Sequence, residues 1–267
     1  PVAGDFNGDG IDDVVWYAPG GAQDYLWQGT VYGRFVGRQL TVNGDYTPVA
    51  GDFDGNGTDD ILWYKPGGDR DDRLWRGKRN GRCVGSSVDV RGTFTPVAGD
   101  VNKDGRDDVF WYGEGTRPDF LWLGTRTSFV SKRFTQDGTG LVPMAADYDK
   151  DGRADVFFYG PDGLPDEIWY GAPGPSFQKR TAIDVGRSYL PVTGRLNRGG
   201  RADVLWYAPG PASDVLYLGA AGRTFSGRSV SIDDVYLPFV GDFNGNGVDD
   251  VFWYGPGRDP DALSLGG

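Results

Sequence analysis

Short apolar stretches alternate with polar turns along the whole chain, and none of the stretches has helical spacing. The clearest of them ends in two aromatic residues, as in DILWY ending at Tyr64 and DVFWY ending at Tyr112. Short segments rich in Val, Trp, Tyr and Phe between Gly, Pro and Asp are typical of β-strands. Because the apolar residues are adjacent and do not alternate with polar ones, both faces of these strands are predicted to be covered.

These stretches belong to a unit that recurs six times. Each copy begins at a proline followed by an apolar pair and an acidic turn, as in PVAGDFNGDG from Pro1 and PVAGDFDGNG from Pro48. The starting prolines are separated by 47, 48, 47, 48 and 47 residues. A constant period of this length indicates a repeat architecture. The predicted repeats are 1–47, 48–95, 96–142, 143–190, 191–237 and a truncated 238–267.

Each unit predicts an inner strand, the acidic turn, a second strand, a Pro/Gly loop, a third strand and an outer strand. Four antiparallel strands repeated every 40–50 or so residues form the blade of a propeller. We therefore predict one all-β domain, 1–267, which is a six-bladed β-propeller of four-stranded antiparallel blades. The sixth unit stops at Gly267, before its fourth strand. Its blade is either completed by a strand from outside this sequence, expected upstream of Pro1, or left three-stranded with an open edge.

Composition excludes several classes of function. The chain has no histidine, which removes the commonest general base and every Ser-His or Cys-His catalytic pair. The single cysteine, Cys83, cannot form an internal disulfide. A formal net charge of −11 argues against a nucleic-acid partner. No apolar run approaches the ~20 residues of a membrane-spanning helix, so we expect no membrane insertion.

The acidic turn has the pattern D-x-[DN]-x-[DN]-G-x-x-D, which predicts a calcium site. Calcium takes about 6–8 oxygen ligands, and this bend offers side chains at positions one, three, five and nine and a backbone carbonyl at position seven. Asp, Asn and Gly also favour turns without an ion, but five such turns in register favour calcium. The predicted ligands are Asp5, Asn7, Asp9, Ile11 and Asp13; Asp52, Asp54, Asn56, Thr58 and Asp60; Asp100, Asn102, Asp104, Arg106 and Asp108; Asp147, Asp149, Asp151, Arg153 and Asp155; and Asp242, Asn244, Asn246, Val248 and Asp250.

The fifth turn lacks this pattern and acts as an internal control. Arg195 replaces the first Asp and Gly199 replaces the fifth-position ligand, which leaves Asn197 and Asp203. A guanidinium at a ligand position repels a cation and can itself pair with Asp203, so this loop is predicted to be empty. The expected total is about five Ca²⁺ ions, whose charge of +10 offsets most of the formal −11. With fewer carboxylates, the sixth site is expected to empty before the fourth.

The turns GDFNGDGIDD, GDFDGNGTDD and GDFNGNGVDD resemble the FG-GAP/VCBS repeats of bacterial surface and secreted proteins, integrin α-subunit propellers and fungal propeller lectins. The resemblance covers all six units and implies a propeller with calcium between the first and second strands. Integrin and fungal lectin propellers have seven blades, so the six repeats depart from those members. Exposed loops of modest affinity hold calcium best where calcium is millimolar, so a secreted, extracellular location is expected.

A binding site is predicted at the opposite end of the blades, where the Pro/Gly loops and the linkers meet. An aromatic face beside a carboxylate suits a sugar ring, which stacks through its C–H face and donates hydroxyl protons. The same residues also have structural interpretations, because an Asp can anchor a turn and an aromatic pair such as Trp63-Tyr64 can pack between blades. In units five and six the Trp series gives way to Tyr217 and Ser264. The candidate ligand-binding residues are Asp24, Trp27, Tyr46, Asp72, Trp75, Phe94, Asp119, Trp122, Asp166, Trp169, Tyr189, Asp214, Tyr236 and Asp261.

Three functions are compatible with this pattern. The first hypothesis is a multivalent carbohydrate-binding lectin, because repeats multiply weak sites into avidity. The second is a protein-binding or adhesion propeller in a larger secreted assembly, whose partner is a secreted or cell-surface protein. The third is a polysaccharide-active enzyme; it is the least favoured, because the paired carboxylates are explained as calcium ligands. We therefore predict a binding module without catalytic residues, whose partners are glycans or such a protein.

Overall fold

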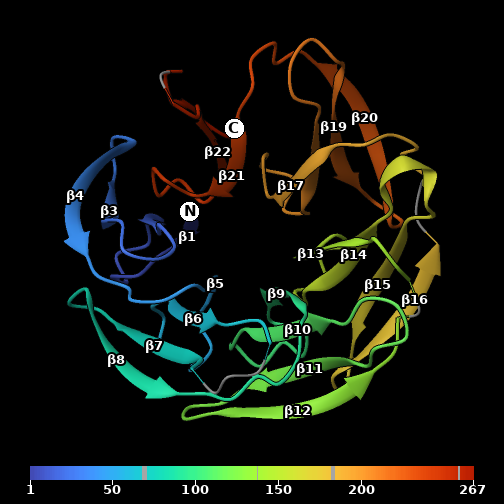
Figure 1. Cartoon of the computed structure of the whole chain (residues 1–267). Helices are drawn as coiled ribbons and strands as arrows, with labels where there is room; N and C mark the ends of the chain where they lie inside the picture. The colour runs from blue at the N-terminus through green and yellow to red at the C-terminus, as the bar shows by residue number, and fades with distance from the viewer. Residues whose placement is uncertain (68–70, 137, 182–183, 258) are drawn as a thin grey trace. The chain divides into compact units, whose positions relative to one another are not determined.

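The computed structural model describes residues 1–67, 71–136, 138–181, 184–257 and 259–267. It is an all-β structure with one antiparallel sheet for each repeat (Figure 1). Five sheets have four strands and the last has three, which confirms the predicted six-bladed propeller class with a shortened final blade. One short 3-10 turn, η1 (Pro161–Gly163), joins two strands of the fourth sheet.

Within each blade the strands follow one another in sequence order. Blades 1 to 3 contain β1 (Val2–Gly4), β2 (Asp13–Trp16), β3 (Asp24–Thr30) and β4 (Arg34–Leu40); β5 (Thr47–Gly51), β6 (Asp60–Tyr64), β7 (Arg73–Lys78) and β8 (Arg82–Ser87); and β9 (Thr95–Gly99), β10 (Asp108–Tyr112), β11 (Asp119–Gly124) and β12 (Phe129–Phe134). Blades 4 to 6 contain β13 (Val142–Ala146), β14 (Asp155–Tyr159), β15 (Glu167–Ala172) and β16 (Ser176–Thr181); β17 (Leu190–Gly194), β18 (Asp203–Tyr207), β19 (Asp214–Ala220) and β20 (Thr224–Val230); and β21 (Leu237–Gly241), β22 (Asp250–Tyr254) and β23 (Ala262–Ser264).

The chain divides into two compact units. The first consists of 1–100, 104–139 and 243–245, and the second of 101–103, 140–242 and 246–267. In both units the acidic turn, here called loop 1 to loop 6 by blade, connects the first and second strands of a blade. The Pro/Gly loop is at the other end of the second strand, as the antiparallel order requires.

The second strands are the most buried elements of each unit, as their uninterrupted apolar sequence predicts. All five residues of β6, β10, β14 and β18 are buried. Their aromatic pairs join neighbouring blades: the Tyr64 ring lies 4.9 Å from that of Trp111 in the first unit, and Tyr159 lies 4.9 Å from Trp206 in the second. The rings meet at 69° and 54°, and both contacts confirm that the aromatic pairs pack between blades.

The tyrosine of each pair also holds the linker into the next blade. The Tyr64 hydroxyl donates to the Gly92 carbonyl at 2.7 Å and accepts the Phe94 N–H at 2.9 Å. Tyr207 makes the same two bonds, to the Asp234 carbonyl at 2.6 Å and from the Tyr236 N–H at 2.8 Å. The linker aromatics that were predicted to bind a ligand are therefore fixed in place by the preceding blade.

A further carboxylate, one residue before the last predicted calcium ligand, connects adjacent blades. Asp59 Oδ2 accepts the N–H of Asp5 at 2.8 Å, and Asp107 Oδ2 accepts that of Asp52 at 3.0 Å. Gly4 makes room for this contact, because a Cβ there would come within 2.6 Å of Asp59 Oδ2. The calcium pattern gives these residues no role, although a doubled Asp ends four of the six loops.

Blades 4 and 5 support this explanation because they lack the connecting carboxylate. Ala202 stands at the position of Asp59, and Ala146 stands at the position of Gly4. The carboxylate and the glycine that would accommodate it are both absent from this pair of blades, although Gly99 is retained in the repeat before Ala154. The backbone bond between these blades remains, from Ala202 N–H to the Asp147 carbonyl at 2.9 Å.

Candidate functional site

The first Asp of each acidic loop organises the backbone of the bend. In loop 2, Asp52 Oδ1 accepts the N–H groups of Gly55 and Asn56 at 2.9 and 3.0 Å, and its Oδ2 accepts that of Gly57 at 2.7 Å. Gly55 and Gly57 have φ values of 73° and 77°, which glycine adopts without strain. The corresponding Asp of loops 1, 3, 4 and 6 accepts the same type of bonds, through Asp5, Asp100, Asp147 and Asp242.

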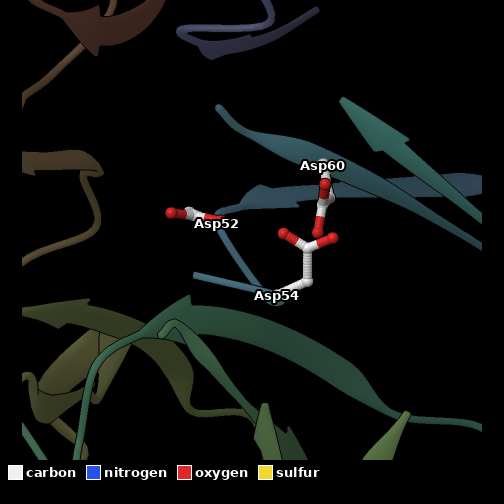
Figure 2. Close-up of side chains that lie close together, drawn as sticks. All are labelled: Asp52, Asp54 and Asp60. Carbon is white, nitrogen blue, oxygen red and sulfur yellow. The ribbon is translucent and has the colours of Figure 1, made fainter. Parts of the chain in front are cut away.

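Loop 2 brings three carboxylates together. One oxygen each of Asp52, Asp54 and Asp60 lies within 4.8 Å of the others, and Figure 2 shows the Asp54 and Asp60 carboxylates facing one another. Asp60 is 1% exposed; its Oδ1 accepts the Gly77 N–H at 2.8 Å, while its buried Oδ2 has no hydrogen-bond partner among the described residues. A buried, unpartnered carboxylate oxygen is costly unless a cation or donor satisfies it. The donor set therefore fits a hard, oxygen-seeking cation.

Electrostatics support the same interpretation of this position. Burial, with smaller repulsion from Asp54 and Asp52, raises the pKa of Asp60 from 3.8 to about 7. Burial raises the pKa of the corresponding Asp13 and Asp155 to about 7 as well. Without a cation these carboxyl groups favour the protonated form, and a divalent ion would favour the carboxylate instead.

Loop 4 forms a second acidic group with a different membership. Asp147, Asp149 and Asp151 lie within 4.8 Å of one another. The predicted ligand Asp155 is not in this group, because its two oxygens accept the N–H groups of Gly171 and Tyr148 at 2.8 and 2.9 Å. The structure therefore brings the first, third and fifth positions together in loop 4, and the first, third and ninth in loop 2.

A cation of the protein itself occupies part of loop 4. Arg223, in the turn between β19 and β20 of blade 5, donates from Nε to Asp149 Oδ2 at 3.0 Å. Its guanidinium is held by stacking 4.1 Å from the centre of the Tyr170 ring and by a 3.0 Å bond to Gln178. In loop 2, Lys78 and Arg76 are more distant from Asp54, at 3.7 and 3.9 Å. Arg223 is the functional residue that sequence spacing could not reveal, since it lies 74 residues from its partner.

The remaining acidic loops have the same bend with fewer assembled carboxylates. Loops 1, 3 and 6 have Asn7, Asn102 and Asn244 at the third position, and no three carboxylates of the described residues converge there. Asp13 accepts the Gly29 N–H at 2.9 Å, and Asp108 and Asp250 accept the equivalent bond. At position seven the backbone N–H donates to the fifth side chain, from Ile11 to Asp9, Arg106 to Asp104, Arg153 to Asp151 and Val248 to Asn246.

Loop 5 lacks the acidic group, and its backbone also differs, because Arg198 has no positive φ at the position where the other five loops have a left-handed residue. Asn197 Nδ2 donates to Asp203 Oδ2 at 2.7 Å, so the amide occupies the oxygen for which Arg195 was the expected partner. Arg195 instead donates its backbone N–H to Asp249 Oδ2 at 2.6 Å. Burial raises the pKa of the Asp249 carboxyl, and this bond and the charge of Arg195 offset part of the rise.

The candidate carboxylates at the start of the third strands have a structural role. Asp72 is buried, and its two oxygens accept the N–H groups of Lys65 at 2.7 Å and Val90 at 2.8 Å. These bonds tie the Pro/Gly loop and the end of the fourth strand to the blade and leave the carboxylate little capacity for a sugar hydroxyl. The same double anchor is made by Asp24, Asp119, Asp166 and Asp214, whereas Asp261 is exposed.

The tryptophan series of the third strands packs on the second strands. Trp122 lies 5.3 Å from Trp111 with the rings at 67°, and Trp75, Trp27 and Trp169 make similar contacts. In blade 6 the corresponding residue is Ser264, whose Oγ accepts the Trp253 Nε1–H at 3.0 Å. In blade 6 a hydroxyl acceptor therefore takes the place of the aromatic face.

One cavity combines several of the candidate residues with exposed polar groups. A space of about 230 Å³ between blades 2 and 3 is lined by Phe94, Phe120, Trp111 and Trp122. Arg91 and Asp89 are exposed beside it and form an ion pair in which Nε and Nη2 lie 3.0 and 2.9 Å from Asp89 Oδ2. Ser131 adds a hydroxyl. The sequence pointed to Phe94 and Trp122, but Asp89, Arg91 and Ser131 carried no repeated signal.

The linker aromatics at the other junctions are half-buried against second-strand rings. Tyr46 lies 6.2 Å from Trp63, Tyr189 lies 6.1 Å from Trp206 and Tyr236 lies 5.7 Å from Trp253.

Among the described residues, no helix has both the length and the apolar composition needed to cross a membrane.

The comparisons agree with the repeats and the fold. The FG-GAP-like repeat family matches residues 5–63 and 100–158, two segments that together make up less than half of the chain. No curated protein matches significantly. A solved lectin of Agrocybe aegerita, described as specifically recognising non-reducing terminal N-acetylglucosamine, is 18% identical with a TM-score of 0.66 over 98% of this chain and 79% of its own.

A second solved structure, a triple arginine-to-alanine mutant of AofleA from Arthrobotrys oligospora, is 13% identical with a TM-score of 0.55 over 95% of this chain and 83% of its own. At these identities the likeness concerns the fold. The family matches nevertheless confirm the resemblance that the acidic turns suggested.

Proposed function

We propose that this protein is a calcium-stabilised, extracellular carbohydrate-binding module of lectin type. The observation that carries the glycan assignment is the cavity between blades 2 and 3, which combines an aromatic lining with an exposed ion pair. A similar fold in a lectin that recognises terminal N-acetylglucosamine supports the same class of ligand.

The cavity has the chemistry that a sugar ring requires. Half-buried Trp122 and Phe94 offer aromatic faces for the C–H side of a pyranose. Arg91 and Asp89 offer a donor and an acceptor for hydroxyl or acetamido groups. At about 230 Å³ the space is below the roughly 300–1,000 Å³ of pockets for drug-sized molecules, and it suits one terminal monosaccharide.

Calcium has a structural part in this proposal. Loops 2 and 4 would hold Ca²⁺ through Asp52, Asp54 and Asp60 and through Asp147, Asp149 and Asp151, with weaker sites in loops 1, 3 and 6. The ion would neutralise carboxylates at the bend between two strands and fix that bend. Loop 5 would remain empty because Arg195 and Gly199 replace two of the ligands and Asn197 donates to the Asp203 oxygen. Exposed sites of this type stay filled at millimolar calcium, which supports an extracellular location.

A glycan array probed with the labelled protein tests the proposed function. We expect binding to glycans with a shared terminal sugar, followed by calorimetry with that monosaccharide. Arg91→Ala and Trp122→Ala should each weaken the affinity at least tenfold. Arg126→Ala, an exposed arginine outside this cavity, is the matched control and should bind normally. Capture of a single secreted protein with no glycan bound would instead favour an adhesion module.

A further inference from the structure

The cavity between blades 2 and 3 adjoins a second cavity, and both lie within the first compact unit. The second cavity has a volume of about 280 Å³ and shares two lining residues, Trp122 and Ser131, with the cavity of about 230 Å³ described above. We call the cavity beside Phe94 and Arg91 the linker cavity, and the second, beside the strands β8 and β12, the strand cavity.

One wall of the two cavities is a single stretch of chain. Residues 86–88 line the strand cavity, and residues 89–91, which follow directly, line the linker cavity. The opposite wall includes β11 and β12, where Trp122 stands opposite Ser131 in the strand register. A ligand that runs along residues 86–91 would therefore meet Trp122 in both cavities.

The Trp122 ring lies close to an aromatic residue of each cavity. Its centre is 5.3 Å from that of Trp111, which lines the linker cavity, and 5.5 Å from that of Phe129, which lines the strand cavity. Trp122 and Phe129 are both half-buried, so each keeps some accessible surface. Each cavity therefore has aromatic surface of its own for the C–H face of a sugar ring.

The strand cavity also has a dense group of hydroxyl groups. Its lining includes the half-buried Ser86 and the exposed Ser87, Thr127, Ser128 and Ser131. Among the described residues that line it, none carries a carboxylate. A hydroxyl group both donates and accepts hydrogen bonds, so this lining matches the hydroxyl groups of a sugar.

The one arginine in this lining, Arg76, is already engaged. Its Nη1 donates to Ser86 Oγ at 2.9 Å, and its Nη2 donates to the Thr127 carbonyl at 2.6 Å. The guanidinium therefore connects β8 of blade 2 with the turn between β11 and β12 of blade 3. Because both terminal nitrogens are occupied within the protein, the cavity favours a neutral ligand over an anionic one.

The corresponding place between blades 1 and 2 shows why the strand cavity is open. There a space of only about 40 Å³ is lined by Arg38 and Leu40, which stand at the repeat positions of Ser86 and Val88. Arg38 Nη2 donates to the Gly81 carbonyl of the next blade at 2.6 Å. In blade 2 the equivalent bond comes from β7, and the two smaller side chains on the fourth-strand side leave the space free.

The corresponding place between blades 5 and 6 is open for a different reason. A space of about 300 Å³ lies there, beside the three-stranded sheet of blade 6. The strand cavity lies instead between two blades with complete four-stranded sheets, so its volume reflects the choice of side chains.

We propose that the two cavities together bind a neutral oligosaccharide of at least two sugar residues. This rests on the proposed function, in which the linker cavity takes the terminal sugar. The next sugar lies in the strand cavity, with its ring against Phe129 and its hydroxyl groups toward the serine and threonine side chains. The combined space exceeds the roughly 300 Å³ at which pockets for drug-sized molecules begin, whereas the linker cavity alone does not.

Glycans of matched length test the proposal. An array that carries neutral hexoses, deoxyhexoses and N-acetylhexosamines, each as mono-, di- and trisaccharide, identifies the series that binds, and calorimetry then measures each Kd. We expect the disaccharide to bind at least tenfold more tightly than the monosaccharide, because the second sugar is held near its cavity by the first. Equal affinities would overturn this proposal and leave the proposed function intact, whereas binding of no series would overturn both.

A transfer of the blade 1 arrangement into blade 2 tests the location. Gln28 and Arg38 stand at the positions of Arg76 and Ser86, so Arg76→Gln combined with Ser86→Arg should fill the strand cavity. In this double variant the ratio of disaccharide to monosaccharide affinity should fall to about one. An unchanged ratio in the folded variant would overturn the proposal.

A smaller substitution and a control complete the test. Val88→Leu introduces the residue that blade 1 has at Leu40 and should lower the same ratio at least threefold. It decides the question if the double variant does not fold, because an unchanged ratio in Val88→Leu would then overturn the proposal. Ser226→Arg adds an arginine at an exposed serine of β20, outside both cavities, and should bind both sugars like the unmodified protein.

Discussion

Loops 2 and 5 lie at the same place in their blades but have opposite chemistry. Both connect a first and a second strand in the same register, with Gly51 opposite Asp60 and Gly194 opposite Asp203. In loop 2 three carboxylates converge and one buried oxygen is left without a partner. In loop 5 Asn197 supplies that partner and no acidic group forms. Strand pairing therefore sets where each loop begins and ends, while the residues of the loop determine its bend and whether it can hold a cation. Gly55 of loop 2 has a φ of 73°, whereas Arg198 at the same position of loop 5 has no positive φ.

Removing calcium with a chelator should have the largest effect, because it acts on loops 2 and 4 but not on loop 5. Removing calcium leaves clustered carboxylates unneutralised in loops 2 and 4 and changes nothing in loop 5. Each site held at 100 times its Kd contributes about 2.7 kcal/mol to the free energy of unfolding, so loss of several sites should lower the Tm markedly. Scanning calorimetry with EGTA and with excess calcium measures this. An unchanged Tm would show that the loops carry no structural ion.

A pair of matched substitutions tests the comparison at one corresponding position in loop 2 and in loop 5. Asp60→Asn keeps the acceptor for the Gly77 N–H but removes the charge, so the protein should bind one ion fewer and lose about 2–3 kcal/mol of unfolding free energy in saturating calcium. Asp203→Asn at the same position of loop 5 should leave the number of bound ions unchanged. Calcium titration calorimetry and metal analysis count the ions. Equal ion loss in both variants would contradict the distinction.

The free energy of unfolding should depend on pH in opposite directions in the calcium-free and the calcium-loaded protein. The folded-state pKa of Asp60, Asp13 and Asp155 is about 7 against an ordinary 3.8, so folding favours their protonated form. In EGTA the stability from these groups is complete at low pH and is lost as the pH rises through about 7. In calcium, protons compete with the ion, and acidification weakens binding.

The drop in Tm caused by chelator should therefore be larger at about pH 8 than at about pH 5.5. Denaturation followed at both pH values, with and without EGTA, gives the four midpoints required. A drop of equal size at both would show that these carboxyl groups do not exchange protons for calcium.

The smallest expected effect is on calcium affinity, and it tests the difference between loops 2 and 4. Arg223 competes for Asp149 in loop 4, so Arg223→Gln should raise the calcium affinity of that loop by about threefold to tenfold. The variant isolates the role of charge because glutamine keeps much of the side-chain length. Arg126→Gln is the exposed control. Calcium titrations of the two variants make the comparison, and weaker binding after Arg223→Gln would show that Arg223 supports the site.

Most of the local structure could be predicted from sequence, but the assignment of roles to carboxylates was only partly possible. The acidic loops, the aromatic pairs and the missing fourth strand all follow from the repeat. The third-strand Asp residues could be predicted as turn anchors or as ligand groups, and only the buried position of Asp72 between two N–H donors distinguishes the alternatives. Asp59 was assigned no role, because its partner Asp5 belongs to another blade.

The repeat predicts the number of blades, the order of their strands and the places where oxygen-rich bends occur. Those features depend on residues within one repeat, and the regular period of the prolines makes them visible. Three features appear only in the folded protein: Arg223 reaches Asp149, Asn197 donates to Asp203, and a cavity opens between blades 5 and 6. The physical reason is that these are contacts of side chains packed in space, and their geometry depends on burial and rotamer, which no repeat pattern encodes.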